Sequence, residues 1–151
     1  MRKVAHLVAV NMGYGHERPA YALRDLSGGE VIIANDYPGI PKADRDLWEA
    51  GRKYYEAVSR MQPVPIVGKT IFHALVDHQQ EIAPFYPRRD LLEVSFQLKL
   101  IAHSIVERKQ GRHLIEMLDR ENRERKSALP LVTTFFAPAF MAEEFGYSGD
   151  I

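Results

Sequence analysis

The expected fold is decided by one stretch near the start of the chain, VAHLVAVNMGYGHERPA at residues 4–20. Its first seven residues are apolar except for one histidine, a pattern typical of a strand buried on both faces of a parallel sheet. A turn with Gly13 and Gly15 follows. Pro19 then fits the first turn of a helix, where its missing N–H does no harm. The stretch therefore predicts a strand, a glycine turn and a helix in direct succession.

The residues after this stretch complete a strand–helix–strand unit. We expect the helix to run past Leu26 and to end at Gly28-Gly29, since glycine favours a helix end. Apolar residues 31–33 predict a second strand over residues 30–34. Two parallel strands joined through a helix make a right-handed crossover. The predicted fold class is therefore α/β, a Rossmann-like parallel sheet with helices on both faces.

Helical periodicity dominates the middle of the chain. It predicts helices over residues 45–61, 67–82 and about 91–126, with Gly111 dividing the last of them. Together these helices would form a long helical insertion before the next strand. The charged run at residues 119–126 is interpreted as a solvated helix end with i,i+4 pairing.

The last part of the chain returns to the strand and helix pattern. Residues 131–136 predict a third strand, and Pro138 then opens a short helix that Gly146 closes. Residues 148–151 resemble the approach to a fourth strand. We therefore expect one Rossmann-like domain over residues 1–151 that stops in mid-architecture, truncated before a further domain.

Composition narrows the function classes. The 20 basic and 20 acidic residues balance, so the charge does not call for a nucleic-acid partner. The chain has no cysteine, which excludes disulfides, thiolate metal sites and a cysteine nucleophile. No stretch approaches the roughly 18 apolar residues of a membrane-spanning helix. The expected location is cytoplasmic, with peripheral membrane contact as a further hypothesis, and we expect neither a metal nor a cofactor.

The glycine turn is the leading candidate for a ligand site. Its glycines let a ligand approach the backbone, and the following helix offers N–H groups and the positive end of its dipole. Parallel α/β sheets bind their ligands at this edge. We therefore expect Gly13, Tyr14, Gly15 and Glu17 to bind substrate. A neutral imidazole can take a proton from a hydroxyl group, so His16 is the candidate catalytic residue.

These residues carry a resemblance to a known group of enzymes. GHERPAYA at residues 15–22 resembles the Gly-His-x-x-Pro-Ala-x-Ala signature of the bacterial lipid-linked N-acetylglucosaminyltransferase of peptidoglycan synthesis. The wider pattern is similar to monogalactosyldiacylglycerol synthase and the diglucosyldiacylglycerol synthases. Their helical region with aromatic residues is similar to residues 47–48 and 54–55. Their later strand, which leads into a His-Pro turn, is similar to FFAP at residues 135–138.

The resemblance implies the two-domain GT-B fold of glycosyltransferases. This chain would be the N-terminal, acceptor-binding half, and a missing C-terminal domain would bind the nucleotide sugar. His16 would be the base or an acceptor contact, Pro138 would also lie at the substrate, and the acceptor could be lipid-linked. Ala137 stands where the lipid glycosyltransferases tend to have histidine, so that contact would be absent. Without the donor-binding domain the chain could not transfer a sugar unaided.

Two alternatives from other classes stay open. The first is a nucleotide- or dinucleotide-binding Rossmann module, because Asp36 stands about where a ribose-binding acid is expected. Against it, Arg18 replaces the third glycine of the dinucleotide fingerprint. The second is a non-catalytic interaction domain that retains the glycosyltransferase half-fold.

Two further motifs are weaker. Gly68-Lys69-Thr70 imitates the end of a phosphate-binding loop, but Pro63 and Pro65 remove N–H groups that such a loop needs, so we interpret it as a helix start. The aromatic and basic stretch FYPRR at residues 85–89 would suit contact with anionic lipid.

Overall fold

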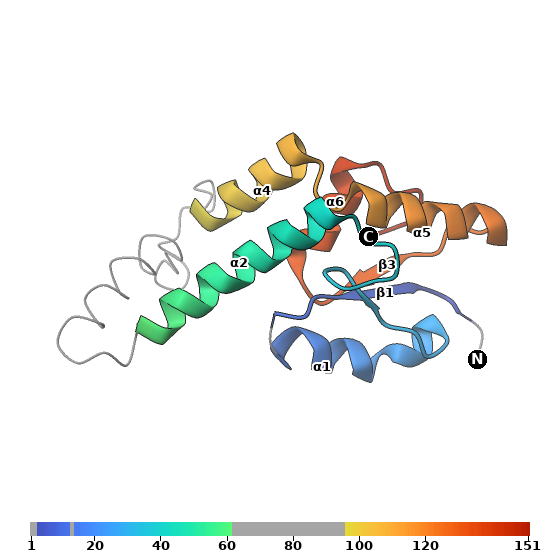
Figure 1. Cartoon of the computed structure of the whole chain (residues 1–151). Coiled ribbons are helices and arrows are strands. Elements are labelled where there is room, and N and C mark those ends of the chain that lie inside the picture. Colours follow the sequence, from blue (N-terminus) through green and yellow to red (C-terminus); the bar gives the residue numbers. More distant parts are fainter. Residues whose placement is uncertain (1–2, 13, 62–95) are drawn as a thin grey trace, which may run out of the picture.

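The computed structural model of the chain describes residues 3–12, 14–61 and 96–151. The elements in these ranges are, in chain order, β1 (His6–Ala9), α1 (Tyr14–Ala22), the 3₁₀ helix η1 (Arg24–Ser27), β2 (Ile32–Ile33), α2 (Lys42–Met61), α4 (Phe96–Arg108), α5 (Arg112–Arg125), β3 (Leu131–Thr133) and α6 (Phe136–Glu144) (Figure 1). The helix predicted over residues 67–82 lies outside the described residues.

The described strands form one parallel sheet with β1 in the centre. The strand order is β2-β1-β3, in which Val8 of β1 pairs with Ile32 of β2 on one side and with Thr133 of β3 on the other. All four residues of β1 are buried, as its apolar sequence predicts. The α/β class and the parallel sheet are therefore confirmed.

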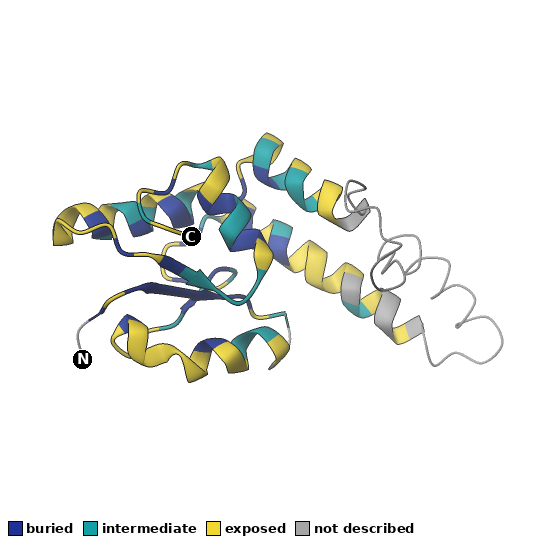
Figure 2. Cartoon of the chain, turned by 180° about the vertical axis from the view of Figure 1, so that it is seen from behind, coloured by how far each residue is buried: buried dark blue, intermediate teal, exposed yellow. Residues whose placement is uncertain are grey.

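Side chains of β1 alternate between two apolar layers. Leu7 and Ala9 pack with Ala20 of α1 on one face of the sheet. Val8 and Val10 belong to the larger core on the other face, to which α5 and α6 contribute. Figures 1 and 2 show α1 on one side of the sheet and α5 and α6 on the other. Helices therefore cover both faces of the sheet.

Helix α1 differs from the prediction at its start. It begins at Tyr14, within the predicted turn, so the prediction that Pro19 lies in the first turn is wrong. Inside the helix, proline supplies no N–H to the carbonyl of Gly15, and its ring crowds that carbonyl. The helix is correspondingly short: it ends at Ala22, η1 follows, and Gly28 ends this segment with a left-handed φ of 72°.

Gly111 divides the long helical segment, as predicted. Its φ of 84° lies in the left-handed region, and a side chain at this position would collide with Met141 of α6. Its N–H donates a hydrogen bond of 3.0 Å to the buried carboxylate of Asp44 in α2. The start of α5 is thus fixed by a close approach to α6 and by a carboxylate from α2.

The charged end of α5 is only partly the solvated helix end that the sequence predicts. Arg125 and Glu121 form an i,i+4 ion pair at 2.7 Å. Asn122, in the middle of the same charged run, is buried. One face of this helix end therefore belongs to the interior.

The end of the chain follows the predicted order with shifted boundaries. Helix α6 begins two residues before Pro138, so this proline does not open the helix but lies within its first turn. Because the helix starts early, β3 is shorter than predicted and ends at Thr133. Residues 148–151 form no strand. The N–H of Leu131 nevertheless donates to the carbonyl of Asp150 at 2.7 Å, in the manner of the first rung of one.

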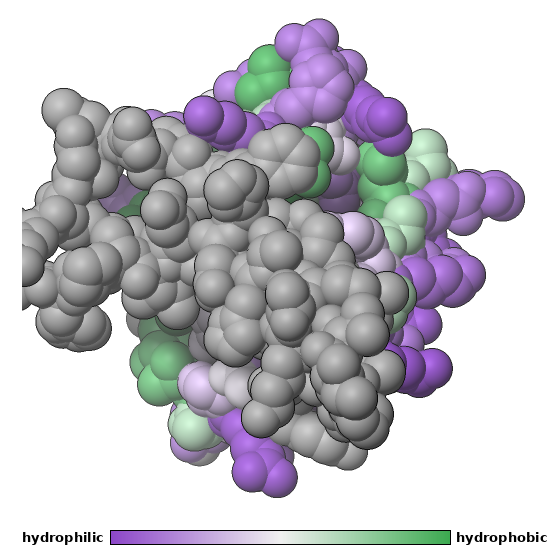
Figure 3. Space-filling model, turned by 90° about the vertical axis from the view of Figure 1, so that its left-hand side faces the viewer, coloured by the Kyte–Doolittle hydropathy of each residue, from purple (hydrophilic) through white to green (hydrophobic). Residues whose placement is uncertain are grey.

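None of the described helices has the length and apolar content needed to cross a bilayer. On the face that Figure 3 shows, hydrophobic residues form small separate groups among hydrophilic ones. Large exposed hydrophobic side chains do occur, among them Leu100 of α4 and Phe136 of α6.

Candidate functional site

The carboxyl ends of the strands lie at one edge of the sheet, where α1 and α6 begin. From β1 the chain passes through α1 to β2 on one side, whereas β3 lies on the other side and leads to α6. Open parallel sheets bind ligands beside such a switch in strand order, outside the carboxyl ends of the strands. The switch here lies between β1 and β3, so residues 10–12, 14–16 and 133–136 lie beside it.

His16 is held at this switch by the end of β3. Its Nδ1 lies 3.2 Å from the backbone carbonyl oxygen of Thr134, and the Thr134 hydroxyl donates in return to the His16 carbonyl at 2.6 Å. The ring packs edge-on against Phe135, with centroids 4.7 Å apart. Two hydrogen bonds and a ring contact thus hold His16 against the end of β3, although His16 and Thr134 are 118 positions apart in the chain.

The Thr134 contact also determines what the imidazole can do. A carbonyl oxygen can only accept, so the hydrogen bond requires a proton on Nδ1 of His16. In the neutral ring Nε2 then carries the lone pair. A half-buried imidazole with this tautomer can accept a proton from a nearby hydroxyl group.

Gly15, which precedes the histidine in the chain, has open space at the position of a Cβ atom. It is exposed, and a Cβ built on it would meet no atom within 4 Å. Its φ lies outside the left-handed region, so nothing in its backbone requires a glycine. Since glycine in a helix costs about 1 kcal/mol relative to alanine, the chain carries this residue without a structural need among the described residues. The open space would admit a ligand close to the first turn of α1.

The other residues predicted to contact the substrate differ in their position and exposure. Tyr14 and Glu17 lie in the first turn of α1, whose N–H groups have no carbonyl partner within the helix. Gly13 and the Tyr14 side chain lie outside what the structure describes. Pro138 is fully buried in the first turn of α6, so in this turn it is Phe136, 41% exposed, that faces the solvent.

A pair of asparagines ties the ends of β1 and β2 together. The backbone N–H of Asn11 donates to Asn35 Oδ1 at 2.8 Å, and Asn35 Nδ2 donates to the Asn11 carbonyl at 3.0 Å. Asp36, the candidate ribose contact of the dinucleotide alternative, lies next to this pair with a largely exposed carboxylate, 3.8 Å from Arg45. The asparagine pair was not predicted, because its partners are 24 residues apart and follow no spacing rule.

A buried polar cluster beyond β2 also escaped prediction. The Tyr37 hydroxyl lies 3.0 Å from His113 Nδ1, and the two rings stack at 5.8 Å. Burial, followed by the charge of Asp44, raises the pKa of Tyr37 above its ordinary value. Burial also raises the pKa of Asp44, although the Gly111 N–H and His113 act against it. Spacing could not reveal the pair, since Tyr37 and His113 are 76 residues apart.

An apolar groove lies on the far side of Phe136. It measures about 820 Å³ and runs between α4, α6 and the last residues of the chain. Leu98, Phe136, Phe140 and Ile151 line it. Phe136 also packs on Phe135 with ring centroids 4.6 Å apart, so an aromatic path connects the groove with His16.

The remaining sequence motifs, at residues 63–70 and 85–89, lie outside the described residues. Within the described ranges, no three histidine, aspartate or glutamate side chains converge as metal ligands.

A scan for known protein families and comparisons with curated proteins and with solved structures find no match to this chain.

Proposed function

We propose that this chain binds the acceptor in a glycosyl transfer reaction and that His16 is the base. The observation that carries the proposal is the hydrogen bond from His16 Nδ1 to the Thr134 carbonyl, at the edge where parallel sheets bind ligands. It leaves Nε2 of the neutral ring as a proton acceptor. The resemblance of residues 15–22 to the lipid-linked glycosyltransferases supplies the reaction class.

In the proposed reaction the acceptor hydroxyl gives its proton to His16 Nε2. The acceptor oxygen then forms a bond to the anomeric carbon of a nucleotide sugar. The bond from that carbon to the diphosphate breaks, and the electron pair leaves with the phosphate. The nucleotide sugar would be held by a second domain of a GT-B enzyme, facing the carboxyl edge of this sheet.

The apolar groove supports an acceptor with an apolar part. A hydroxyl at His16 would be continuous, through Phe135 and Phe136, with the space between α4 and α6. Apolar surface in such a groove gains roughly 25 cal/mol for each Å² that it removes from water. A lipid-linked acceptor presented at a membrane surface is the proposed substrate.

The arrangement of the elements is compatible with half of a GT-B fold. In the described residues, three helices (α2, α4 and α5) separate β2 from β3, and we propose that they correspond to the helical insertion of the acceptor domain. Helix α1 is the next element after β1, and Gly15 and His16 lie in its first turn.

The test compares wild type with His16→Ala and the matched control His103→Ala, whose histidine is exposed on α4. Binding of diacylglycerol in mixed micelles is followed by NMR, and transfer from UDP-sugars is measured with a donor-binding domain supplied. We expect His16→Ala to lower transfer by at least about tenfold with an unchanged fold, and His103→Ala to leave it unchanged.

Other results would support the alternatives. Unchanged turnover in His16→Ala would remove this histidine from the mechanism. A thermal shift with NAD(P), with none for UDP-sugars or micelles, would favour the dinucleotide-binding module, which uses Asp36. No binding of any of these ligands would favour the non-catalytic interaction domain.

A further inference from the structure

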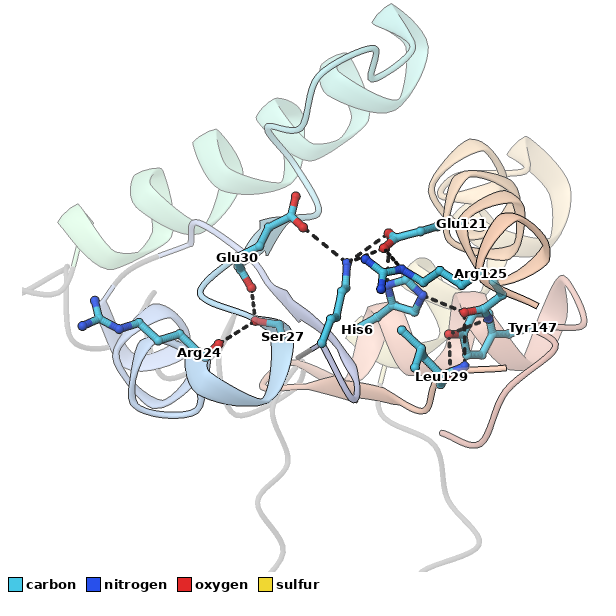
Figure 4. Close-up of polar contacts among 10 residues, drawn as sticks. His6, Arg24, Ser27, Glu30, Glu121, Arg125, Leu129 and Tyr147 are labelled. Atoms are coloured by element: carbon cyan, nitrogen blue, oxygen red, sulfur yellow. Dashed lines mark hydrogen bonds and ion pairs between the residues drawn. The ribbon is translucent and has the colours of Figure 1, made fainter. Parts of the chain in front are cut away.

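A buried polar cluster lies at the amino end of β1, away from His16. His6 is 0% exposed, and the neighbouring Lys3 is only 9% exposed. Figure 4 shows that side chains from β1, from α5 and from the segment after α6 meet here. Both His6 and Lys3 contact Glu121 of α5, so the cluster joins the central strand to the helix that covers it.

The orientation of Asn122 fixes the tautomer of His6. Asn122 Oδ1 accepts from the Leu129 N–H at 3.1 Å, while its Nδ2 donates to Tyr147 Oη at 3.2 Å and to Ser148 Oγ at 3.1 Å. A backbone N–H can only donate, so the amide cannot be flipped. His6 Nε2 lies 2.9 Å from the same Oδ1 and must therefore carry a proton.

The other ring nitrogen of His6 has no hydrogen-bond partner. In the neutral ring Nδ1 is a bare acceptor, and it is completely buried. Oε2 of Glu121, which is also an acceptor, lies 3.6 Å from it. One proton between these two atoms would turn an unfavourable contact into a charge-assisted hydrogen bond.

The surrounding charges oppose that proton at neutral pH. Glu121 already accepts from Lys3 Nζ at 3.0 Å and from Arg125 Nε at 2.7 Å, and Lys3 also reaches Glu30 at 3.3 Å. With a neutral His6, the two cations and the two carboxylates of this cluster balance.

The pKa values of the cluster follow from burial and from these contacts. Burial lowers the pKa of His6 below its ordinary value; Asn122 and Glu121 raise it, while Lys3 and Arg125 lower it. Burial acts to raise the pKa of Glu121, but the hydrogen bonds from Lys3 and Arg125 outweigh this and leave it lowered. On the third side, burial raises the pKa of Tyr147, whose ring meets His6 edge-on at 6.3 Å.

We propose that His6 is a proton-operated latch between β1 and α5. In its neutral form it leaves Glu121 bound to Lys3 and Arg125. A proton taken from solvent at Nδ1 draws Glu121 onto the imidazole and weakens the contact of Glu121 with Lys3, and so loosens residues 3–5, which precede β1.

The direction of the pH effect follows from linkage. The folded-state pKa of His6 is lower than its value of 6.5 in the unfolded chain, so between the two the unfolded chain binds more protons. The stability that neutral His6 contributes is present above pH 6.5 and is lost as the pH falls toward the lower folded value. Within that window the unfolding equilibrium constant rises by up to about tenfold for each pH unit.

The first experiment uses the unchanged chain. Isotope-labelled protein is titrated by NMR from neutral to acidic pH, following the His6 ring nitrogens, the Glu121 carboxyl carbon and the Lys3 side chain. We expect a protonated Nε2 and a bare Nδ1 at neutral pH, and then one common transition of all three groups below pH 6.5. A proton on Nδ1 at neutral pH, a Glu121 or Lys3 signal that does not follow His6, or a His6 that stays neutral until the chain unfolds would each overturn the latch.

The second experiment tests the role of Glu121. In Glu121→Gln the amide still accepts from Lys3 but no longer attracts a protonated imidazole, so we expect the proton affinity of His6 to fall about tenfold. The matched control is Glu124→Gln, which removes an exposed carboxylate from the same helix and is expected to leave the His6 transition in place. An unchanged transition in Glu121→Gln, or an equal shift in both variants, contradicts the proposal.

Discussion

His6 lies at the amino end of β1 and His16 beyond its carboxyl end, in the first turn of α1, and the two imidazoles differ in what they can contact. Each has one ring nitrogen bound to an oxygen that can only accept: Asn122 Oδ1 for His6 and the Thr134 carbonyl for His16. In His6 the remaining nitrogen is sealed inside the protein, whereas the ring of His16 is only half-buried. The sealed nitrogen can exchange only a proton with its surroundings, while the partly exposed ring can meet a ligand.

The largest loss of stability is expected when the hydrogen-bond partners of the buried His6 cluster are removed. Asn122→Ala removes the partner of His6 Nε2 and of the Leu129 N–H in one step, while the Tyr147 hydroxyl keeps its hydrogen bond to the Leu129 carbonyl. Leaving buried polar groups without partners costs about 1–3 kcal/mol each, and we expect a total loss of about 3 kcal/mol in the free energy of unfolding, measured in urea. Arg123→Ala, on the exposed neighbouring position, is the control and should stay within about 0.5 kcal/mol of wild type. A loss below 1 kcal/mol for Asn122→Ala would show that the buried contacts around His6 do not contribute more to stability than the contacts around His16.

How much the sequence predicts also differs between the two ends. The strand and the helix that meet at the carboxyl edge are predicted correctly, because their signal is local: an apolar strand, two glycines and a histidine follow one another within residues 4–16. The amino-end cluster was not predicted, because its polar partners come from distant parts of the chain, with Asn122 lying 116 residues from His6. Burial of Asn122 was hidden by its neighbours, since a run of charged residues is typical of a solvated helix.

Element boundaries show the same limit. The order of strands and helices follows from periodicity, but α1 already begins at Tyr14, within the turn that the sequence predicts, so Pro19 lies inside the helix and not in its first turn. Helix α6 likewise starts before Pro138 rather than at it. Proline indicates that a helix begins nearby, and the contacts of the preceding loop determine at which residue the helix begins. At the candidate site, Thr134 and Phe135 were missed as partners of His16, since only the pairing of β3 with β1 brings them together.

A smaller loss of stability is expected when one of the hydrogen bonds that hold the partly exposed His16 is removed. Thr134→Val keeps the backbone carbonyl that holds His16 Nδ1 but removes the hydroxyl that binds the His16 carbonyl. One lost hydrogen bond of this kind costs about 1 kcal/mol in the free energy of unfolding. If the pair of bonds positions the imidazole, transfer should also fall several-fold through kcat, with KM for the acceptor little changed.

The matched variant for this comparison is Thr133→Val. It removes a neighbouring hydroxyl that bonds only within its own turn, to the carbonyl and the N–H of Phe135. A similar cost in stability with normal transfer is expected for it. Equal losses of transfer in both variants would mean that the β3–α6 turn matters as a whole and that the Thr134 hydroxyl has no particular role toward His16.

The smallest change in stability, and of opposite sign, is expected at Gly15. The residue is helical and exposed, and a methyl group there meets no atom within 4 Å, so Gly15→Ala should raise the free energy of unfolding by about 0.5 kcal/mol. Gly51→Ala in α2 is a close control, because Gly51 is also helical and exposed, with open space at its Cβ position. Both variants should gain stability in urea unfolding, but only Gly15→Ala should weaken binding of diacylglycerol micelles, since only its methyl group lies in the first turn of α1. Normal binding by Gly15→Ala would mean that no ligand approaches the first turn of α1 closely, and the proposed site would then have to lie on the Phe136 side of the imidazole.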